Sequence, residues 1–530
     1  MNQIRKVNFA MRLLSQGQVG EAASLSGRLL AESPDAAEVQ ALACEVAMAQ
    51  DQAAAALEHI DRAIGLDPEK PEYRLRKAQI QLICRRGLEA QATAAELAAR
   101  HPGNSEIQLS VARLYGECGN HAGAEAFLQA VPADERNGAE FLSRFATNQF
   151  FLGRTESAEQ AIADYLALQP PAIGRKLLLR SMLRTQTPDR NHVASLRGFL
   201  DGSPPPNEAV NACFALAKEL EDLGEHRDSF ETLRTGAALQ KRLIRYRLTD
   251  ELANIRGLLE TFRAEAFDAI PESGATESPV FIVGLPRTGT TLVERLVTRG
   301  GDVRSAEEIY DFTLAFTSVI NEYLAANPER GLSPLAAALE VDYGEIARRY
   351  LANMRGMLGD ASVYLDKTPF NYLYCGLIRK AFPRARIIHM VRDPMDACYA
   401  VFKTLFSRAY FYSYDLDDLA AYYVAYRETM DHWHRLMPGA ILDVRYEALV
   451  SDPLTVSRQI AEFVGIPWSE EMVEIEDSSR ACSTASAAQV REPIYTSSIG
   501  RWRNVADGME PVRQRLEAAR LVDENGNPTA

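Results

Sequence analysis

The chain has 530 residues, which is enough for two or three domains. Hydrophobic residues make up 47% of the sequence and charged residues 25%, a balance that excludes wholesale disorder. The formal net charge of −14 excludes a general nucleic-acid binder, because such proteins carry an excess of lysine and arginine.

The cysteine pattern and the N-terminus favour a cytoplasmic protein. The seven cysteines are odd in number and form no C-x-x-C pair, so they indicate neither a zinc site nor a disulfide framework. The opening stretch MNQIRKVNFAMRLLSQG lacks the apolar centre of a signal peptide. No run approaches the ~18 apolar residues of a membrane helix. We therefore expect a protein with no membrane partner and no nucleic-acid partner.

A 34-residue period runs through the first part of the chain. Three similar phrases end in a proline at this interval: Pro34, Pro68 and Pro102. An alanine stands twelve residues before each proline, and the alanine series continues at the same interval: Ala22, Ala56, Ala90, Ala124 and Ala158. Three units have a glycine five residues before the alanine: Gly17, Gly119 and Gly153. A small residue lets two antiparallel helices approach closely, and the glycine turns the chain between them.

This period resembles the tetratricopeptide repeat family. The resemblance extends from Gly17 to Gln169, with weaker cover to Arg242. We expect an all-α repeat solenoid over residues 1–245 and a linker helix and loop over 246–278. An irregular alanine-rich helical bundle is the alternative, which the regular spacing disfavours. The concave surface of a solenoid often binds peptides, but packing on the second domain or formation of a homodimer is equally open.

The second part of the chain predicts an α/β fold. Four short apolar strands are each followed by a helical stretch: VFIVG (280–284), SVYLD (362–366), ARIIHMVRD (385–393) and AILDVRYE (440–447). This alternation indicates a parallel sheet that is covered on both faces. Ligands of such sheets bind beyond the carboxyl ends of the strands. We therefore expect a site in the loops after Val283, Leu365 and Val391.

The loop GLPRTGTTL, which begins at Gly284, is P-loop-like. A Walker A loop reads G-x-x-x-x-G-K-[ST], and Gly284, Gly289 and Thr291 occupy its glycine and hydroxyl positions. Thr290 stands where the lysine belongs, and Arg287 lies inside the loop. Backbone N–H groups at a helix N-terminus bind anions. A nucleoside triphosphate usually requires the missing lysine and a magnesium ion, whereas a phosphosulfate carries less charge and can be bound without metal.

Four motifs in a fixed order resemble the sulfotransferase family: RTGTTL, DKTPFN, RIIHMVRDPMDACYA and SSIGRWRN. Within that family the nearest resemblance is to the bacterial repeat-fused branch and the tyrosylprotein sulfotransferases. The resemblance covers residues 279–510, and we expect a sulfotransferase domain over 279–530. It implies 3′-phosphoadenosine 5′-phosphosulfate (PAPS) as the co-substrate and no metal.

The resemblance also implies the residues of the donor site. The 5′-phosphosulfate would be held by Arg287, Thr288, Gly289, Thr290 and Thr291. Arg392 would bind the 3′-phosphate through its guanidinium. The family usually has a serine eight residues later, where this chain has Ala400, and Lys403 is the candidate substitute. Three later residues have donor-site counterparts in the family: Tyr446, Ser498 and Arg501.

For catalysis, the segment RSAEE resembles the R-x-x-E-E segment of the tyrosylprotein sulfotransferases. It implies Glu308 as the base for the acceptor hydroxyl, with Glu307 as the alternative. Lys367 and Arg287 would stabilise the charge that develops on the leaving phosphate. We expect His389 to be a packed core residue. The aromatic cluster YFYSYDL (410–416) either borders the acceptor pocket or packs on the next helix.

The expected reaction is sulfuryl transfer from PAPS to an acceptor hydroxyl, with the repeats selecting or presenting the acceptor. A peptide or protein tyrosine is favoured over a sugar or a small metabolite. Two alternatives stay open. One is a P-loop kinase acting on a small molecule, which the absence of the loop lysine disfavours. The other is a catalytically weak repeat scaffold that only binds a ligand or partner, which Ala400 favours.

Overall fold

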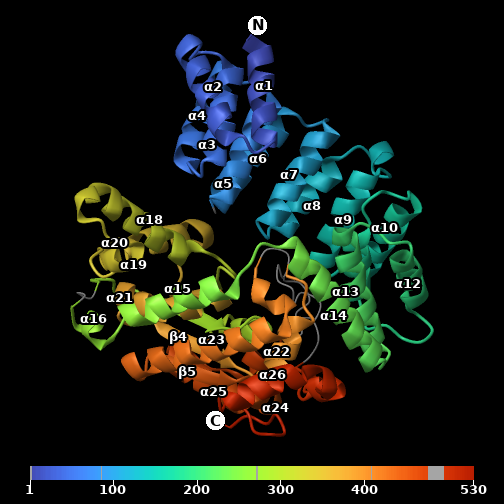
Figure 1. Ribbon diagram of the computed structural model, residues 1–530, viewed down its shortest axis with the longest axis vertical. Helices are drawn as coiled ribbons and strands as arrows, with labels where there is room; N and C mark the ends of the chain where they lie inside the picture. Colours follow the sequence, from blue (N-terminus) through green and yellow to red (C-terminus); the bar gives the residue numbers. More distant parts are fainter. Residues whose placement is uncertain (1–2, 85, 270–272, 407–408, 476–493, 530) are drawn as a thin grey trace. The chain divides into compact units, whose positions relative to one another are not determined.

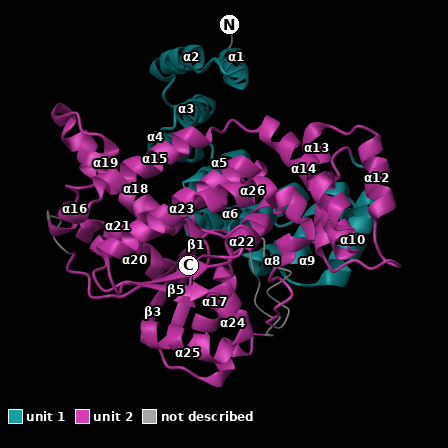
Figure 2. Cartoon of the chain, turned by 60° about the horizontal axis from the view of Figure 1, so that its bottom comes forward, with its two compact units in different colours: residues 1–170 teal, residues 171–530 magenta. Residues whose placement is uncertain are grey.

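The computed structural model describes residues 3–84, 86–269, 273–406, 409–475 and 494–529. Their contacts divide the chain into two compact units, Met1–Pro170 and Pro171–Ala530 (Figure 2). Within the described residues, every helix is too short or too polar to cross a membrane.

Unit 1 is built from helix pairs that follow one another along the chain (Figure 1). The helices are α1 (Gln3–Ser15), α2 (Val19–Glu32), α3 (Ala37–Ala49), α4 (Ala53–Leu66), α5 (Pro71–Ile83), α6 (Gly87–Arg100), α7 (Ser105–Glu117), α8 (His121–Ala130), α9 (Ala139–Phe151) and α10 (Thr155–Ala167). The five periodic alanines lie in the second helix of each pair and are at most 1% exposed: Ala22, Ala56, Ala90, Ala124 and Ala158. The prediction of an all-α repeat solenoid is therefore confirmed.

The turns inside the pairs explain the glycine positions. Gly17, Gly119 and Gly153 have φ of 77°, 76° and 77°, a left-handed backbone that side chains disfavour. In the second pair Asp51 takes the same place with φ of 59°. Gly224 repeats this geometry with φ of 79° between α13 (Pro206–Asp222) and α14 (His226–Leu243).

The contacts of α13 and α14 place them in unit 2, together with four further helices: α11 (Gly174–Met182), α12 (Val193–Asp201), α15 (Leu248–Thr261) and α16 (Ala264–Ala269). The domain limits at residues 245 and 279 stay predictions.

The centre of unit 2 is a parallel sheet of five strands: β1 (Val280–Gly284), β2 (Val303–Ser305), β3 (Val363–Asp366), β4 (Arg386–Val391) and β5 (Ile441–Arg445). The strands lie in the order β2-β3-β1-β4-β5, and every pairing is parallel. The four predicted strands and the parallel sheet are confirmed. The short edge strand β2 was not predicted, because only Val303 of its three residues is apolar.

Helices cover both faces of the sheet. The helices in this part of unit 2 are α17 (Thr290–Val297), α18 (Asp311–Ala326), α19 (Pro334–Ala337), α20 (Tyr343–Leu358), α21 (Cys375–Ala381), α22 (Pro394–Phe402), α23 (Leu416–Leu436), α24 (Tyr446–Ser451), α25 (Pro453–Val464) and α26 (Ala506–Ala518). On β1, Ile282 packs in a core with residues of α17 and α25. Phe281 points to the other face, where its ring lies 6.0 Å from that of Phe312 and 5.7 Å from that of Tyr350. All five residues of β1 are buried, as a doubly covered strand requires.

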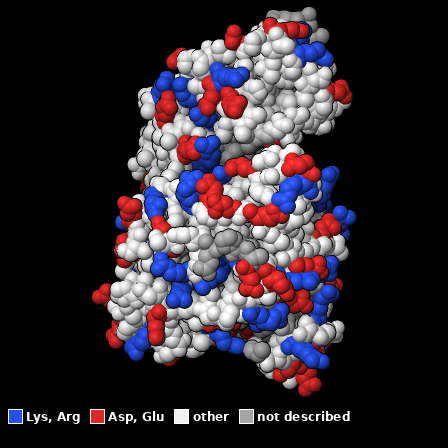
Figure 3. All heavy atoms as spheres, turned by 90° about the vertical axis from the view of Figure 1, so that its left-hand side faces the viewer, with Lys and Arg blue, Asp and Glu red and all other residues white. Residues whose placement is uncertain are grey.

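The surface carries both signs of charge. Lysine and arginine side chains are interspersed with aspartate and glutamate on the face that Figure 3 displays.

Candidate functional site

The predicted site residues follow the carboxyl ends of the strands, one strand after another. Across the sheet, Glu308 follows β2, Lys367 follows β3, the glycine-bounded loop follows β1, Arg392 follows β4 and Tyr446 follows β5. Parallel strands bring these ends to one edge of the sheet, which is where ligands of open α/β sheets bind.

The loop between β1 and α17 is held in an unusual backbone conformation. Arg287 has φ of 67°, a left-handed value that costs a non-glycine residue about 1–3 kcal/mol and recurs at ligand-binding sites. Gly289, the residue before α17, has φ of 101°, and a Cβ atom there would lie 2.7 Å from Cδ2 of Tyr446. Thr288 is buried, and its hydroxyl donates to the carbonyl oxygen of Leu285 at 2.7 Å. The Thr288 side chain therefore stabilises the conformation of the loop.

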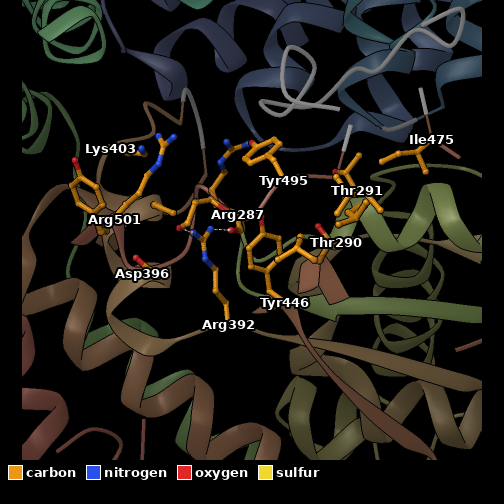
Figure 4. A pocket seen from close by; sticks show the side chains of 17 residues that line it. Arg287, Thr290, Thr291, Arg392, Asp396, Lys403, Tyr446, Ile475, Tyr495 and Arg501 are labelled. Atoms are coloured by element: carbon orange, nitrogen blue, oxygen red, sulfur yellow. Dashed lines mark hydrogen bonds between the residues drawn. The ribbon is translucent and has the colours of Figure 1, made fainter. Parts of the chain in front are cut away.

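A pocket lies beside this loop. Nine of the predicted residues line it: Arg287, Gly289, Thr290, Thr291, Arg392, Lys403, Tyr446, Ser498 and Arg501. Figure 4 shows Arg287, Arg392 and Tyr446 near its middle, with Thr290 and Thr291 to one side and Lys403 and Arg501 to the other. The structure thus gathers four basic side chains around one cavity.

Arg392 joins three segments of this pocket. Its Nη1 donates to the carbonyl oxygen of Arg287 at 2.9 Å, and its Nη2 donates to that of Ser498 at 2.8 Å. Its guanidinium carbon lies 4.8 Å from the ring centre of Tyr446, whose hydroxyl is 2.6 Å from Oγ of Ser498. The buried Nε has no hydrogen-bond partner among the described residues. A buried donor without a partner is unfavourable.

Asp396 is a pocket residue that the sequence-based prediction missed. It is 1% exposed and accepts hydrogen bonds from the backbone N–H groups of Gly500 and Trp502. It thereby fixes the loop that carries Ser498 and Arg501. Its partners lie more than a hundred positions away along the chain, so no local pattern could have identified it.

Glu221, on α13, is the second residue that the sequence-based prediction missed. Its Oε1 and Oε2 lie 2.8 and 2.9 Å from Nζ of Lys403, and the hydroxyl of Tyr399 donates to Oε1 at 3.1 Å. Burial lowers the pKa of Lys403, whereas the pKa of Glu221 is lowered by Lys403 against the effect of burial. Lys403 therefore reaches the pocket beside Ala400 as one half of a largely buried ion pair.

Replacing Lys403 by methionine should destabilise unit 2 by about 3 kcal/mol, because it leaves the Glu221 carboxylate buried without its counter-charge. The double variant with Glu221→Gln should recover most of this loss. Urea unfolding followed by tryptophan fluorescence measures it, since all three tryptophans, Trp433, Trp468 and Trp502, belong to unit 2. Additive losses in the double variant would contradict the proposed coupling.

Glu308 and Lys367 form a second cluster, and neither lines the pocket just described. The side chain of Lys367 is fully buried, with Nζ 2.8 Å from Oε1 of Glu308 and 3.6 Å from Oε2 of Glu294. Burial acts to lower the pKa of Lys367, but these carboxylates raise it to about 12. The Glu308 side chain is 41% exposed. Burial lowers the pKa of Arg287, and the charge of Glu308 acts to raise it. The structure thus brings Glu308 and Lys367 into contact and leaves the carboxylate accessible.

The structure also describes the backbone of the alternative base, Glu307, and part of the aromatic cluster. Glu307 has φ of 57°, and its carbonyl oxygen accepts the backbone N–H of Lys367 at 3.0 Å. In the aromatic cluster, Tyr412 is buried and its ring stacks on that of Tyr422 of α23 at 3.6 Å. Tyr412 therefore packs on the following helix, which is one of the two expected outcomes.

A parallel α/β sheet with a glycine-bounded loop and four basic side chains around one pocket is an arrangement that suits an anionic ligand. Two family models match the chain. Residues 279–470 match the sulfotransferase family, and residues 13–80 and 86–143 match the tetratricopeptide repeat. The chain therefore carries separate regions that match the tetratricopeptide repeat and the sulfotransferase family.

Several curated proteins and solved structures are similar to the chain. An uncharacterized protein of Aquifex aeolicus (strain VF5) is 27% identical over 374 residues, which are 69% of this chain and 48% of that protein. The chain thus spans about half the length of this relative. Protein-tyrosine sulfotransferase A of Caenorhabditis elegans is 26% identical over 278 residues, 47% of this chain and 68% of that protein. The sulfotransferase domain from the Synechococcus PCC 7002 olefin synthase aligns at 18% identity with a TM-score of 0.33, covering 46% of this chain and 97% of that domain.

Proposed function

We propose that the protein transfers a sulfuryl group from PAPS to an acceptor hydroxyl. The observation that carries this proposal is the position of Arg392, which lines one pocket together with Arg287, Lys403 and Arg501. A co-substrate with two separate anionic groups suits four basic side chains spread across one cavity. The match of residues 279–470 to the sulfotransferase family supports the same donor.

In this proposal the donor lies along the carboxyl edge of the sheet. The 5′-phosphosulfate faces the N-terminus of α17, where the backbone N–H groups and hydroxyls of Thr290 and Thr291 are donors. The 3′-phosphate faces Arg392 and Lys403. The Glu221 carboxylate holds the Lys403 ammonium beside Ala400, so the lysine replaces the hydroxyl that Ala400 lacks. Tyr446 and the loop fixed by Asp396 close the other walls.

The chemical step needs one proton acceptor and one stabilised leaving group. The acceptor oxygen attacks the sulfur, the bond between sulfur and the bridging oxygen breaks, and the hydroxyl proton passes to Glu308. The leaving 3′-phosphoadenosine 5′-phosphate retains the electron pair of the broken bond. Its developing charge is stabilised by Lys367 and Arg287. A pKa of about 12 keeps Lys367 positively charged at neutral pH.

The proposed acceptor is a tyrosine of a peptide or protein. The relative from Caenorhabditis elegans that matches the chain is named for protein-tyrosine sulfation, and this supports a tyrosine over a sugar hydroxyl. The repeats of unit 1 would select the acceptor through their concave surface. A cytoplasmic location and a homodimer remain part of the proposal.

Binding of 3′-phosphoadenosine 5′-phosphate tests the donor site directly. At ~100 times its dissociation constant this product should add about 2.7 kcal/mol to the stability of unit 2, which raises the melting temperature by a few degrees. Thermal unfolding followed by tryptophan fluorescence measures the shift. A shift with ATP and magnesium but not with 3′-phosphoadenosine 5′-phosphate would favour the kinase alternative. No shift with either ligand would favour the non-catalytic scaffold.

A further inference from the structure

A cluster of two imidazoles and a carboxylate lies at the β5 edge of the sheet, outside the proposed donor pocket. Nδ1 of His389 is 2.7 Å from Oδ1 of Asp443, and Nε2 of His434 is 2.9 Å from the same oxygen. These three ligand atoms lie within 4.8 Å of one another. None of the three residues lines the pocket of Figure 4.

The cluster comes from three separate elements that the fold holds together. His389 of β4 and Asp443 of β5 are partners in the parallel ladder, so their side chains share one face of the sheet. His434 lies in the last turn of α23, which packs on that face. The sequence-based prediction of a packed core histidine fits His389, which is fully buried. The sequence alone could not identify His434 and Asp443 as neighbours of His389, because the three residues come together only in the folded chain.

We propose that His389, His434 and Asp443 form a site for a divalent cation of the zinc type. Two imidazole nitrogens and one carboxylate oxygen are the ligand set that zinc, cobalt and nickel accept, with water completing the coordination. This proposal rests on the cluster alone and is independent of the proposed sulfuryl transfer.

The surroundings of the histidines suit a metal ligand. Nε2 of His389 contacts the hydroxyl of Tyr426, which fixes the ring and leaves Nδ1 directed at Asp443. Such a hydrogen bond on the far ring nitrogen is usual for metal-bound histidine.

The other two ligands, His434 and Asp443, give an ion access to the cluster and can adjust their positions to it. The side chains of His434 and Asp443 are 34% and 43% exposed, so an ion reaches the cluster from solvent. Zinc bonds of about 2.0–2.2 Å require the ligand atoms to separate slightly, and these two partly exposed side chains can make that movement. The positive charge of Arg427 acts on both histidines and opposes the binding of a cation. Arg427 also pairs with Asp431 at 3.9 Å. The bound ion would link the C-terminal end of α23 to the edge strand β5.

Metal titration of the intact chain tests this site. After treatment with EDTA and its removal, Co²⁺ should bind with visible absorption bands of a tetrahedral centre, and Zn²⁺ should displace it. His434→Gln and Asp443→Asn should each weaken Co²⁺ binding by at least tenfold and reduce these bands. His432→Gln is the matched control, since His432 lies on the same helix and its Nε2 contacts the carbonyl oxygen of Phe262.

Two outcomes would overturn the site. One is the absence of tetrahedral cobalt bands in the intact chain. The other is cobalt binding that His434→Gln and Asp443→Asn leave unchanged, which would place the ion on other histidines or cysteines. Both substitutions fall on partly exposed side chains, and tryptophan fluorescence verifies that unit 2 is folded.

Discussion

Replacing Glu308 by glutamine should lower kcat for sulfuryl transfer by about 10²–10⁴-fold, the range associated with general base catalysis. The amide is isosteric but cannot accept the proton of the acceptor hydroxyl. Lys367 keeps Glu294 within 3.6 Å, so the buried ammonium retains a counter-charge and unit 2 should stay folded. Transfer of ³⁵S from PAPS to a tyrosine-containing peptide measures the rate, and binding of 3′-phosphoadenosine 5′-phosphate should be nearly unchanged.

Two comparisons make this result specific. Glu329→Gln, on an exposed segment, is the matched control and should retain full activity. Glu307→Gln separates the two candidate bases. If Glu307→Gln loses activity and Glu308→Gln keeps it, the role of base passes to Glu307. The φ of 57° at Glu307 and the use of its carbonyl by Lys367 lead us to expect the opposite.

Replacing Arg392 by alanine should weaken binding of 3′-phosphoadenosine 5′-phosphate by about 100-fold or more, since each hydrogen bond to a charged group is worth about 1.5–3 kcal/mol. The change removes the proposed phosphate ligand and also releases the carbonyl groups of Arg287 and Ser498. Arg392→Lys should give an intermediate loss, because an ammonium keeps the charge but cannot span both carbonyls. Isothermal titration calorimetry measures these affinities.

The control for Arg392 is Arg503→Ala, an exposed arginine that contacts Trp502 and Asn527. Its affinity for the bisphosphate should equal that of the unmodified protein. An Arg392→Ala protein that is folded and binds the bisphosphate within twofold of normal would remove Arg392 from the donor site. The absence of a hydrogen-bond partner for Nε of Arg392 among the described residues would then need an explanation other than donor binding.

Local patterns in the sequence account for most of the fold. The 34-residue alanine series predicts close helix contacts, and Ala22 and its counterparts are buried at these contacts. The apolar runs predict four of the five strands, because a doubly covered strand such as Val280–Gly284 must be apolar throughout. Strand β2 lacks this signal, since it is a three-residue edge strand.

The site is less fully encoded in local patterns. The strand ends predict that the loops after Val283 and Val391 lie close together, and Arg287 and Arg392 of these loops line one pocket. Asp396 and Glu221 escape prediction because each acts on a distant segment. Thr288 illustrates the reverse case, since the loop motif implies a phosphate ligand but its hydroxyl is bonded to Leu285. Which hydroxyls face the pocket depends on loop geometry, which a motif does not specify.

The position of Glu221 limits how this chain can be recombined. Its carboxylate comes from α13, more than fifty residues before the region that matches the sulfotransferase family, yet it neutralises a lysine of the pocket. Phe230 of α14 likewise packs on Phe402, with ring centres 5.7 Å apart. A fragment that begins at residue 279, where the match to the sulfotransferase family starts, would therefore lack both the counter-charge of Lys403 and the packing partner of Phe402.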